Sequence, residues 1–198
     1  MPYYLIDDIE NVKEIDTDRA VGHRAIMARM PDGVLDKNSP RASADILWGI
    51  HEGGSVFVHT PLSLDYPVVG EVPSLVPGEV HQVSIMMERS HKVTAHVPDE
   101  LWSAGVRPQN RRVAVPEDSS PQWCRDKLAS AGFEVVDGEF STGLVKRGNG
   151  TIPTVSFSGT VRVLDDCDNA ANAAVKGIGR SKNYGCGMLM FLNNAIQN

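Results

Sequence analysis

Four glycines crowd one short segment of the chain, at Gly177, Gly179, Gly185 and Gly187. A helical pattern precedes this segment, and an apolar run at residues 188–192 follows it. Because glycine has no Cβ, the pattern predicts a helix-to-strand loop whose backbone closely approaches a partner, and phosphate is a natural one. A tight turn that serves only packing is the alternative. Dinucleotide folds and P-loops are excluded, since their glycine loop precedes a helix and the helix N-terminus faces the phosphate.

The first half of the chain alternates strand and helix patterns. Asp18 is a typical N-cap and predicts a helix that runs to about Met30, where Pro31 follows. The other expected elements are strands at residues 3–6, 55–60 and 80–88 and a short helix at residues 44–50.

The second half mixes strand and helix in the same way without repeating the residues of the first. Gly132 ends an expected helix at residues 121–131, and Asp168 is expected to cap another that runs to Lys176. Residues 146–150 predict a hairpin tip, because Asn149 and Gly150 supply the positive backbone angles of a tight turn. Strands are expected at residues 111–115, 133–136, 154–163 and 188–192.

These patterns predict an α+β chain built from two tandem ferredoxin-like (RRM-like) domains. We expect the first domain at residues 1–92 and the second at residues 98–198. The connection is expected within residues 98–108, which begin and end with proline and contain Gly105.

The composition limits which partners the protein is expected to bind and in which cell compartment it is expected to lie. The net charge of -6 argues against a nucleic-acid partner, yet residues 1–18 carry six acids and one base, so the other 180 residues carry only -1. The three cysteines lie too far apart to form a zinc clamp or a redox pair. No apolar run approaches the roughly 20 residues that span a bilayer, and the acidic start is unlike a signal peptide. We therefore expect a cytoplasmic protein.

Several motifs of this sequence resemble those of one known family. The specific motif is residues 155–161 (VSFSGTV) followed by the glycine segment at residues 177–189. Residues 111–113 (RRV) and 123–128 (WCRDKL) resemble the family's basic strand and the helix that follows it, and residues 45–48 (DILW) resemble its second N-terminal helix. The family is CasE, the endoribonucleases that process CRISPR precursor RNA in the subtype I-E Cascade complex. The resemblance covers most of the chain, and its glycine segment is the specific part.

The resemblance implies an activity, its partners and a catalytic residue. The expected reaction cuts precursor RNA at the 3' base of the CRISPR repeat hairpin by attack of the 2'-hydroxyl and leaves a 2',3'-cyclic phosphate. The expected partners are this RNA hairpin, retained as crRNA, and the other Cascade subunits. The family's catalytic histidine matches His23, and an imidazole with a pKa of about 6.5 suits proton transfer near neutral pH. Lys182, in the matched loop, is expected to neutralise the phosphate in the transition state or to bind the RNA backbone.

One position departs from the family pattern. Members often carry a tyrosine one helical turn before the histidine, and this chain has Ala20 there. We expect either a slower reaction or a substitute hydroxyl from Tyr3, Tyr4 or Tyr184.

Basic residues at strand ends, at the hairpin tip and in the glycine segment suit recognition of an A-form stem by its backbone and shape. The expected RNA-binding residues are Arg24, Arg107, Arg111, Arg112, Lys146, Arg147, Lys176, Gly177, Gly179, Arg180, Gly185 and Gly187. RNA brings its own nucleophile, so we expect no metal site, no small-molecule cofactor and no membrane partner. Two other functions stay open: a module that binds the hairpin without cutting it, and an unrelated ferredoxin-like enzyme or regulator.

Overall fold

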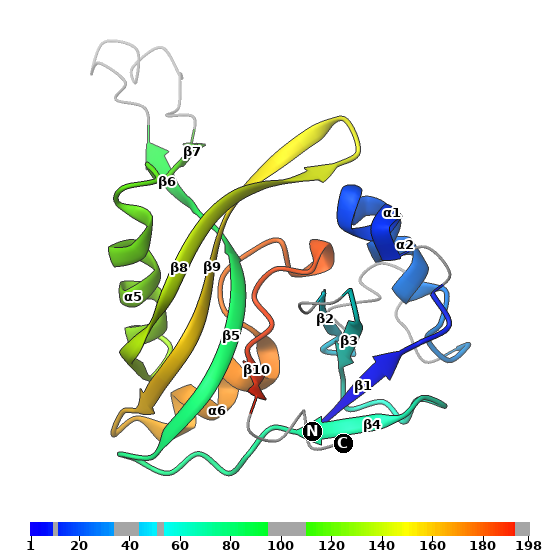
Figure 1. Ribbon diagram of the computed structural model, residues 1–198, viewed down its shortest axis with the longest axis horizontal. Helices are drawn as coiled ribbons and strands as arrows, with labels where there is room; N and C mark the ends of the chain where they lie inside the picture. Colours follow the sequence, from blue (N-terminus) through cyan, green and yellow to red (C-terminus); the bar gives the residue numbers. More distant parts are fainter. Residues whose placement is uncertain (10–11, 34–43, 51–53, 95–109, 193–198) are drawn as a thin grey trace, which may run out of the picture.

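The computed structural model describes residues 1–9, 12–33, 44–50, 54–94 and 110–192. Its elements are arranged as two four-stranded sheets and one two-stranded sheet, together with helices (Figure 1). In chain order they are β1 (Pro2–Ile6), α1 (Val12–Thr17), α2 (Arg19–Met27), β2 (Leu47–Ile50), β3 (Val56–His59), β4 (Val68–Glu71), β5 (Val80–Glu88), β6 (Ser90–Thr94), β7 (Asn110–Ala114), α5 (Ser120–Ala129), β8 (Phe133–Arg147), β9 (Gly150–Val163), α6 (Cys167–Lys176), the 3-10 turn η1 (Lys182–Tyr184) and β10 (Met190–Phe191).

The first sheet has four antiparallel strands in the order β2-β3-β1-β4. Its central strand β1 is buried on both faces, because successive side chains of a strand point to opposite sides. Tyr4 and Ile6 join Ile26 of α2 in a core that belongs to this half, whereas Tyr3 joins the core of the other half. Strand β1 therefore lies at the boundary between the two halves.

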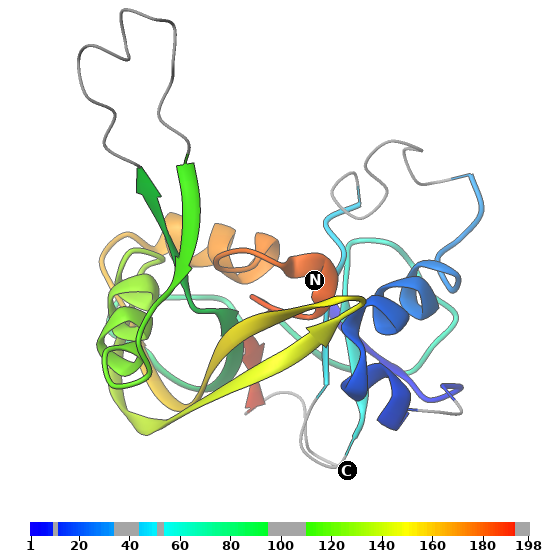
Figure 2. The same cartoon turned by 90° about the horizontal axis from the view of Figure 1, so that it is seen from above.

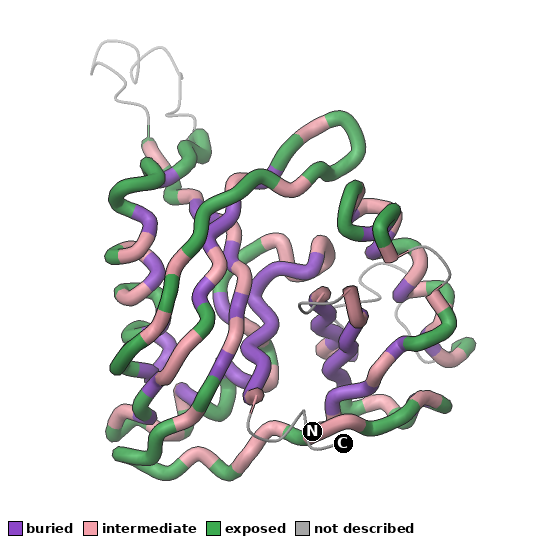
Figure 3. Tube along the Cα trace, in the orientation of Figure 1, coloured by how far each residue is buried: buried purple, intermediate pink, exposed green. Residues whose placement is uncertain are grey.

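The second sheet is also four-stranded and antiparallel, in the order β10-β5-β9-β8. Val83, Ile85 and Met87 of β5 alternate along the strand and face the core that α5 and α6 cover with Leu128 and Ala174. Buried positions follow the inner strands, while the long β8–β9 hairpin becomes exposed toward its tip (Figure 3). The expected α+β class with two tandem ferredoxin-like units is confirmed.

The strand pairing divides the chain differently from the expected boundary. Strand β5 falls within residues 1–92, yet it pairs along its whole length with β9 of the second sheet. Its alternating apolar residues match the second core, and no local signal could show that choice of partner. We propose that the division between the two halves falls at residues 72–79. The expected connection at 98–108 lies outside the described residues, and the flanking strands β6 and β7 pair with each other.

Some local predictions were wrong. Residues 47–50 form strand β2 rather than part of a helix, because this apolar run is buried on both sides, with Trp48 in the first core and Leu47 against Met188. The cap of α6 is Asp166, whose side chain accepts from the backbone N–H of Asn169, and not Asp168. At the hairpin tip the positive backbone angle belongs to Gly148, with φ of 54°, rather than to Asn149. The capped helix at Asp18 is confirmed. No helix in the described ranges is long and apolar enough to cross a membrane.

Side-chain hydrogen bonds tie the two halves together, among them one from Tyr3 and one to Asp18. The Tyr3 hydroxyl donates to the carbonyl of Leu189 at 2.8 Å in a buried position. The Asp18 carboxylate accepts from the backbone N–H of Ala20 at 2.9 Å and from that of Gly148 at 3.0 Å. Both bonds to this carboxylate lower the pKa of Asp18, and the bond from Gly148 has the larger effect. One residue thus caps α2 and holds the tip of the β8–β9 hairpin, which reaches across to α2 (Figure 2).

Removal of the Tyr3 hydroxyl should show how much its hydrogen bond to Leu189 stabilises the protein. Tyr3→Phe deprives the buried Leu189 carbonyl of this donor, so we expect the free energy of unfolding to fall by about 1–2 kcal/mol in urea titrations. The control is Tyr66→Phe, whose hydroxyl donates to Asp8 at 3.1 Å in an exposed position and whose loss should cost less than about 0.5 kcal/mol. Equal losses at both positions would contradict this account.

Removal of the Asp18 carboxylate should release the hairpin tip. Because the folded pKa lies below the ordinary value of about 3.9, the tether is complete above that pH and is lost as the pH falls through the lower folded pKa. We expect the difference in Tm between the wild type and Asp18→Ala to be constant above about pH 5 and to shrink in more acidic buffer. Asp166→Ala is the matched control, since Asp166 caps α6 in the same way without a bond to the hairpin. Exchange of the Gly148 amide proton should accelerate in Asp18→Ala and not in the control.

Candidate functional site

His23 lies on α2 at the junction of the two halves. Its side chain is half-buried, and its Nδ1 is shielded from solvent. The centroid of its ring is 6.3 Å from that of Tyr184 at an interplanar angle of 66°, an edge-to-face contact. Tyr184 belongs to η1 within the glycine segment, so a residue of the first half meets the segment that precedes β10.

The β8–β9 hairpin brings a positive charge to the same place. The Cζ atom of Arg147, at the tip of this hairpin, is 5.3 Å from the ring centroid of Tyr184. Such a distance allows the guanidinium to interact with the ring face. His23, Tyr184 and Arg147 therefore come together from a helix, a loop and a hairpin, and Asp18 ties the helix to the hairpin through Gly148.

Of the three tyrosines expected to substitute for the missing one at position 20, Tyr184 lies beside His23. Tyr3 is buried with its hydroxyl donating to Leu189, and the Tyr4 hydroxyl donates to the carbonyl of Leu62 at 2.9 Å. Both hydroxyls are thus engaged inside the protein. Tyr184 is only half-buried and contacts the imidazole through its ring.

Lys182 lies at the carboxyl end of α6. Its Nζ donates to the carbonyl of Gly177 at 2.9 Å and also to that of Lys176. A cation there satisfies carbonyls that the helix leaves open and complements the negative end of its dipole. Its expected role at the phosphate stays a prediction.

The glycines of the segment pack mostly against protein. A Cβ on Gly177 would lie 2.7 Å from the carbonyl oxygen of Gly187, and one on Gly185 would lie 3.2 Å from both Arg19 and Trp48. Gly179 is different, since no atom lies within 4 Å of the place a Cβ would take. Close packing thus accounts for the glycines at 177, 185 and 187, whereas contact of any of the four with RNA stays a prediction.

The basic residues expected to bind RNA lie in separate parts of the structure. Lys146 and the exposed Arg24 lie near Asp18, whose pKa both help to lower, and so near the group around His23. Arg111 and Arg112 are exposed on β7, in the two-stranded β6–β7 ladder away from α2 (Figure 1). Lys176 and Arg180 are also exposed, whereas Arg107 lies outside the part of the chain that the structure describes.

Two of the exposed basic residues, Arg112 and Arg180, lie near Glu88. The Arg112 guanidinium donates to the Ser90 hydroxyl at 3.3 Å, and Ser90 in turn donates to Glu88 at 2.5 Å. Ser181 of the glycine segment also donates to Glu88. Burial acts most strongly on Glu88 and raises its pKa, but the two hydroxyls and the charges of Arg180 and Arg112 together lower this pKa below its ordinary value. Glu88 therefore offsets part of the positive charge of Arg112 and Arg180.

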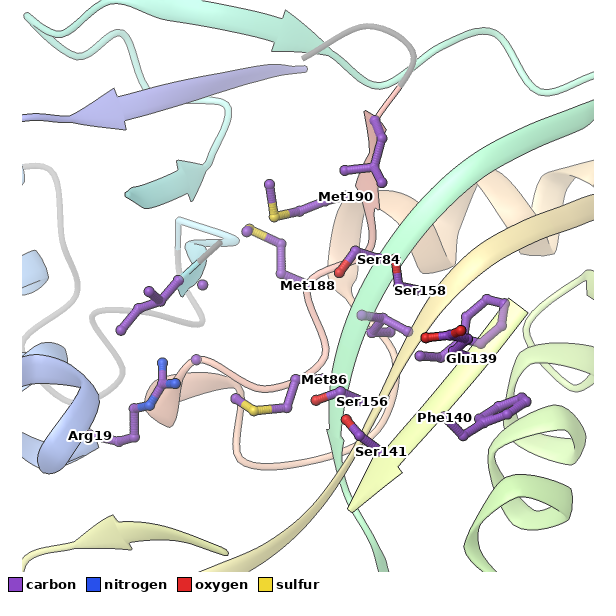
Figure 4. Close-up of a pocket in the computed structure, with 16 residues that line it drawn as sticks. Arg19, Ser84, Met86, Glu139, Phe140, Ser141, Ser156, Ser158, Met188 and Met190 are labelled. Carbon is purple, nitrogen blue, oxygen red and sulfur yellow. The ribbon is translucent and has the colours of Figure 1, made fainter. Parts of the chain in front are cut away.

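A cavity of about 560 Å³ lies beside this junction. Its walls include hydroxyls of β5, β8 and β9 and the side chains of Met188 and Met190, and Arg19 of α2 is also among its lining residues (Figure 4). Sequence reasoning did not single out Arg19. The described ranges contain no group of three or more histidine, cysteine, aspartate and glutamate side chains that could hold a metal ion.

The same fold occurs in solved structures. Cse3 of Thermus thermophilus, bound to an RNA representing a pre-cleavage complex, is 17% identical with a TM-score of 0.70 over 96% of this chain and 98% of that chain. Cas6e of Escherichia coli K-12 is 18% identical with a TM-score of 0.60 over 96% of both chains. A chain of a CRISPR RNA-guided surveillance complex is 19% identical with a TM-score of 0.60 over 98% of both.

No curated protein matches the sequence. A family model described as CRISPR associated protein matches residues 7–192, which is nearly the whole chain. The chain belongs to this family of CRISPR associated proteins, as its resemblance to CasE led us to expect.

Proposed function

We propose that this chain is an endoribonuclease that binds the stem-loop of CRISPR repeat RNA, cuts the precursor at the 3' base of the hairpin and keeps its product as a Cascade subunit. The observation that carries the proposal is the meeting of His23, Tyr184 and Arg147 at the junction of the two halves. The family match supports it. So does the fold, which is shared with Cse3 bound to RNA and with a chain of a CRISPR RNA-guided surveillance complex.

The proposed reaction needs only groups that the RNA and this chain supply. The 2'-oxygen attacks the adjacent phosphorus and loses its proton, the bond from phosphorus to the 5'-oxygen breaks, and that oxygen takes up a proton. The products are a 2',3'-cyclic phosphate and a 5'-hydroxyl. His23 moves one of these protons, since an imidazole titrates near neutral pH. Arg147 and Lys146 offset the negative charge that grows on the phosphate.

Tyr184 supplies the hydroxyl that Ala20 lacks. Its ring lies edge-to-face with His23, and Arg147 lies near the same ring. The phenol either orients the leaving oxygen or helps to protonate it. The Ala20 departure is thereby compensated from a loop rather than from the helix.

Replacement of His23 tests the assignment directly. His23→Ala should slow single-turnover cleavage of a labelled repeat hairpin by at least about 100-fold, because proton transfer by a placed side chain contributes that much or more. Binding of an uncleavable hairpin with a 2'-deoxy residue at the scissile position should be nearly unchanged. EDTA should not alter the wild-type rate, and end-group analysis should find the cyclic phosphate. Full activity of His23→Ala would refute its role, and a wild type that shifts the RNA without cutting it would favour a hairpin-binding module instead.

Replacement of Tyr184 tests the compensating hydroxyl. Tyr184→Phe keeps the ring contacts with His23 and Arg147, so we expect unchanged RNA binding and a rate about tenfold lower, the equivalent of one hydrogen bond of about 1.4 kcal/mol. The matched control is Tyr4→Phe, whose hydroxyl donates to Leu62 within the first core and should not affect the rate. Equal rates for Tyr184→Phe and the wild type would exclude the phenol from the reaction.

A further inference from the structure

Arg19 is a buried cation directly beneath the candidate site. It lies on α2 four residues before His23, a spacing that puts two side chains on the same face of a helix. Only 4% of its surface is exposed. Figure 4 shows its side chain reaching from α2 toward the glycine segment and the cavity.

The surroundings of Arg19 satisfy few of its donors. One nitrogen, Nη2, donates to Asp16 at 2.9 Å, and the guanidinium carbon lies 5.7 Å from the centroid of the Trp48 ring. The other two nitrogens, Nε and Nη1, are shielded from solvent and have no hydrogen-bond partner among the described residues. A guanidinium has five N–H groups, so most of its capacity is unused.

Neighbouring groups offset this charge only weakly. The side chain of Asp16 is 64% exposed, so solvent screens the ion pair. Cys186 lies close enough to act on Arg19, but burial raises the pKa of this thiol to about 12 and leaves it neutral near pH 7. Burial accordingly lowers the pKa of Arg19. A buried ion pair of this kind often stabilises a protein less than an apolar side chain of similar volume does.

Arg19 lies against the part of the glycine segment that presents Tyr184 to His23. Its Nη1 would be 3.2 Å from a Cβ on Gly185, the residue after Tyr184, and Gly185 has φ of 76°. Trp48, next to Arg19, donates from its indole N–H to the carbonyl of Asn183 at 3.2 Å. The residues on either side of Tyr184 therefore rest on Arg19 and Trp48.

We propose that Arg19 is a positioning residue of the cleavage reaction, and that it acts through its charge rather than through its bulk. Without touching RNA, the buried and weakly offset guanidinium makes the potential around Tyr184 and His23 more positive, where negative charge grows on the phosphate. Its contacts with the segment also hold the Tyr184 ring in place. This inference rests on the proposed endoribonuclease function. It gives a role to a buried charge that neighbouring groups offset only weakly.

Two variants of this chain separate the effect of the charge from that of the bulk. Arg19→Met keeps a long flexible side chain and removes the charge, whereas Arg19→Lys keeps the charge. We expect the Tm of Arg19→Met to equal or exceed that of the wild type, while its single-turnover rate falls about tenfold. The Kd for an uncleavable 2'-deoxy hairpin should change less than about threefold, because Arg19 does not touch RNA. Arg19→Lys should recover most of the rate.

Arg29→Met is the matched control. It removes the same charge shortly after the end of α2, where Arg29 pairs with Asp8 at 2.7 Å on the surface. Its rate should equal that of the wild type. A smaller rate for both methionine variants would indicate a general effect of net charge and would overturn the inference.

The remaining outcomes are equally decisive. A wild-type rate for Arg19→Met would exclude a role of the charge. A fall in Tm of several degrees with a loss of rate that lysine does not restore would mean that Arg19 serves only the fold. Both results overturn this inference and leave the proposed function intact, provided that the wild type cleaves the hairpin. Failure of the wild type to cleave would overturn both.

Discussion

The contact of the glycine segment with both halves is the constraint on which the site depends. The backbone N–H of Gly187 donates to Met86 of β5 at 2.6 Å, and its carbonyl accepts from Ile178 at 2.8 Å. On the other side the carbonyl of Asn183 accepts from Trp48 of β2. The segment is thus fixed to one sheet at its end and to the other in its middle. Because Tyr184 stands between these two anchors, its position relative to His23 follows from the packing of the two halves.

This packing also decides which positive charges are available. Lys182 is engaged with carbonyls at the end of α6, and Arg112 and Arg180 lie near Glu88. Arg147, by contrast, faces a neutral ring, and both Lys146 and Arg24 lie near Asp18. The group around His23 therefore keeps a local excess of positive charge in a chain whose net charge is -6. An acidic total is compatible with a phosphate-binding site when the basic side chains are concentrated in this way.

The sequence predicts local features of this molecule better than distant ones. The N-cap at Asp18 and the alternation of β5 and β9 are visible in adjacent residues, so the helix and the strands there could be predicted. The apolar run at β2 could not be assigned by pattern alone, since a short buried strand and a short buried helix look alike. Pairing of β5 with β9 joins residues more than 60 positions apart and has no local signal. Within the site, the resemblance singled out His23, but the convergence of Tyr184, Arg147 and Arg19 on it required coordinates.

In the proposed mechanism the tyrosine comes from the glycine segment and not from α2, and this changes what controls the reaction. Two side chains one turn apart on a helix keep their relation as long as that helix persists, because backbone hydrogen bonds within the helix fix it. His23 and Tyr184 have no such common element. Their separation depends on Trp48 and Gly185, on the Asp18 tether and on the bond from Tyr3 to Leu189. Loosening of the contact between the halves would therefore separate the two rings while each half is still folded, so the rate of cleavage is coupled to the interface before it is coupled to global unfolding.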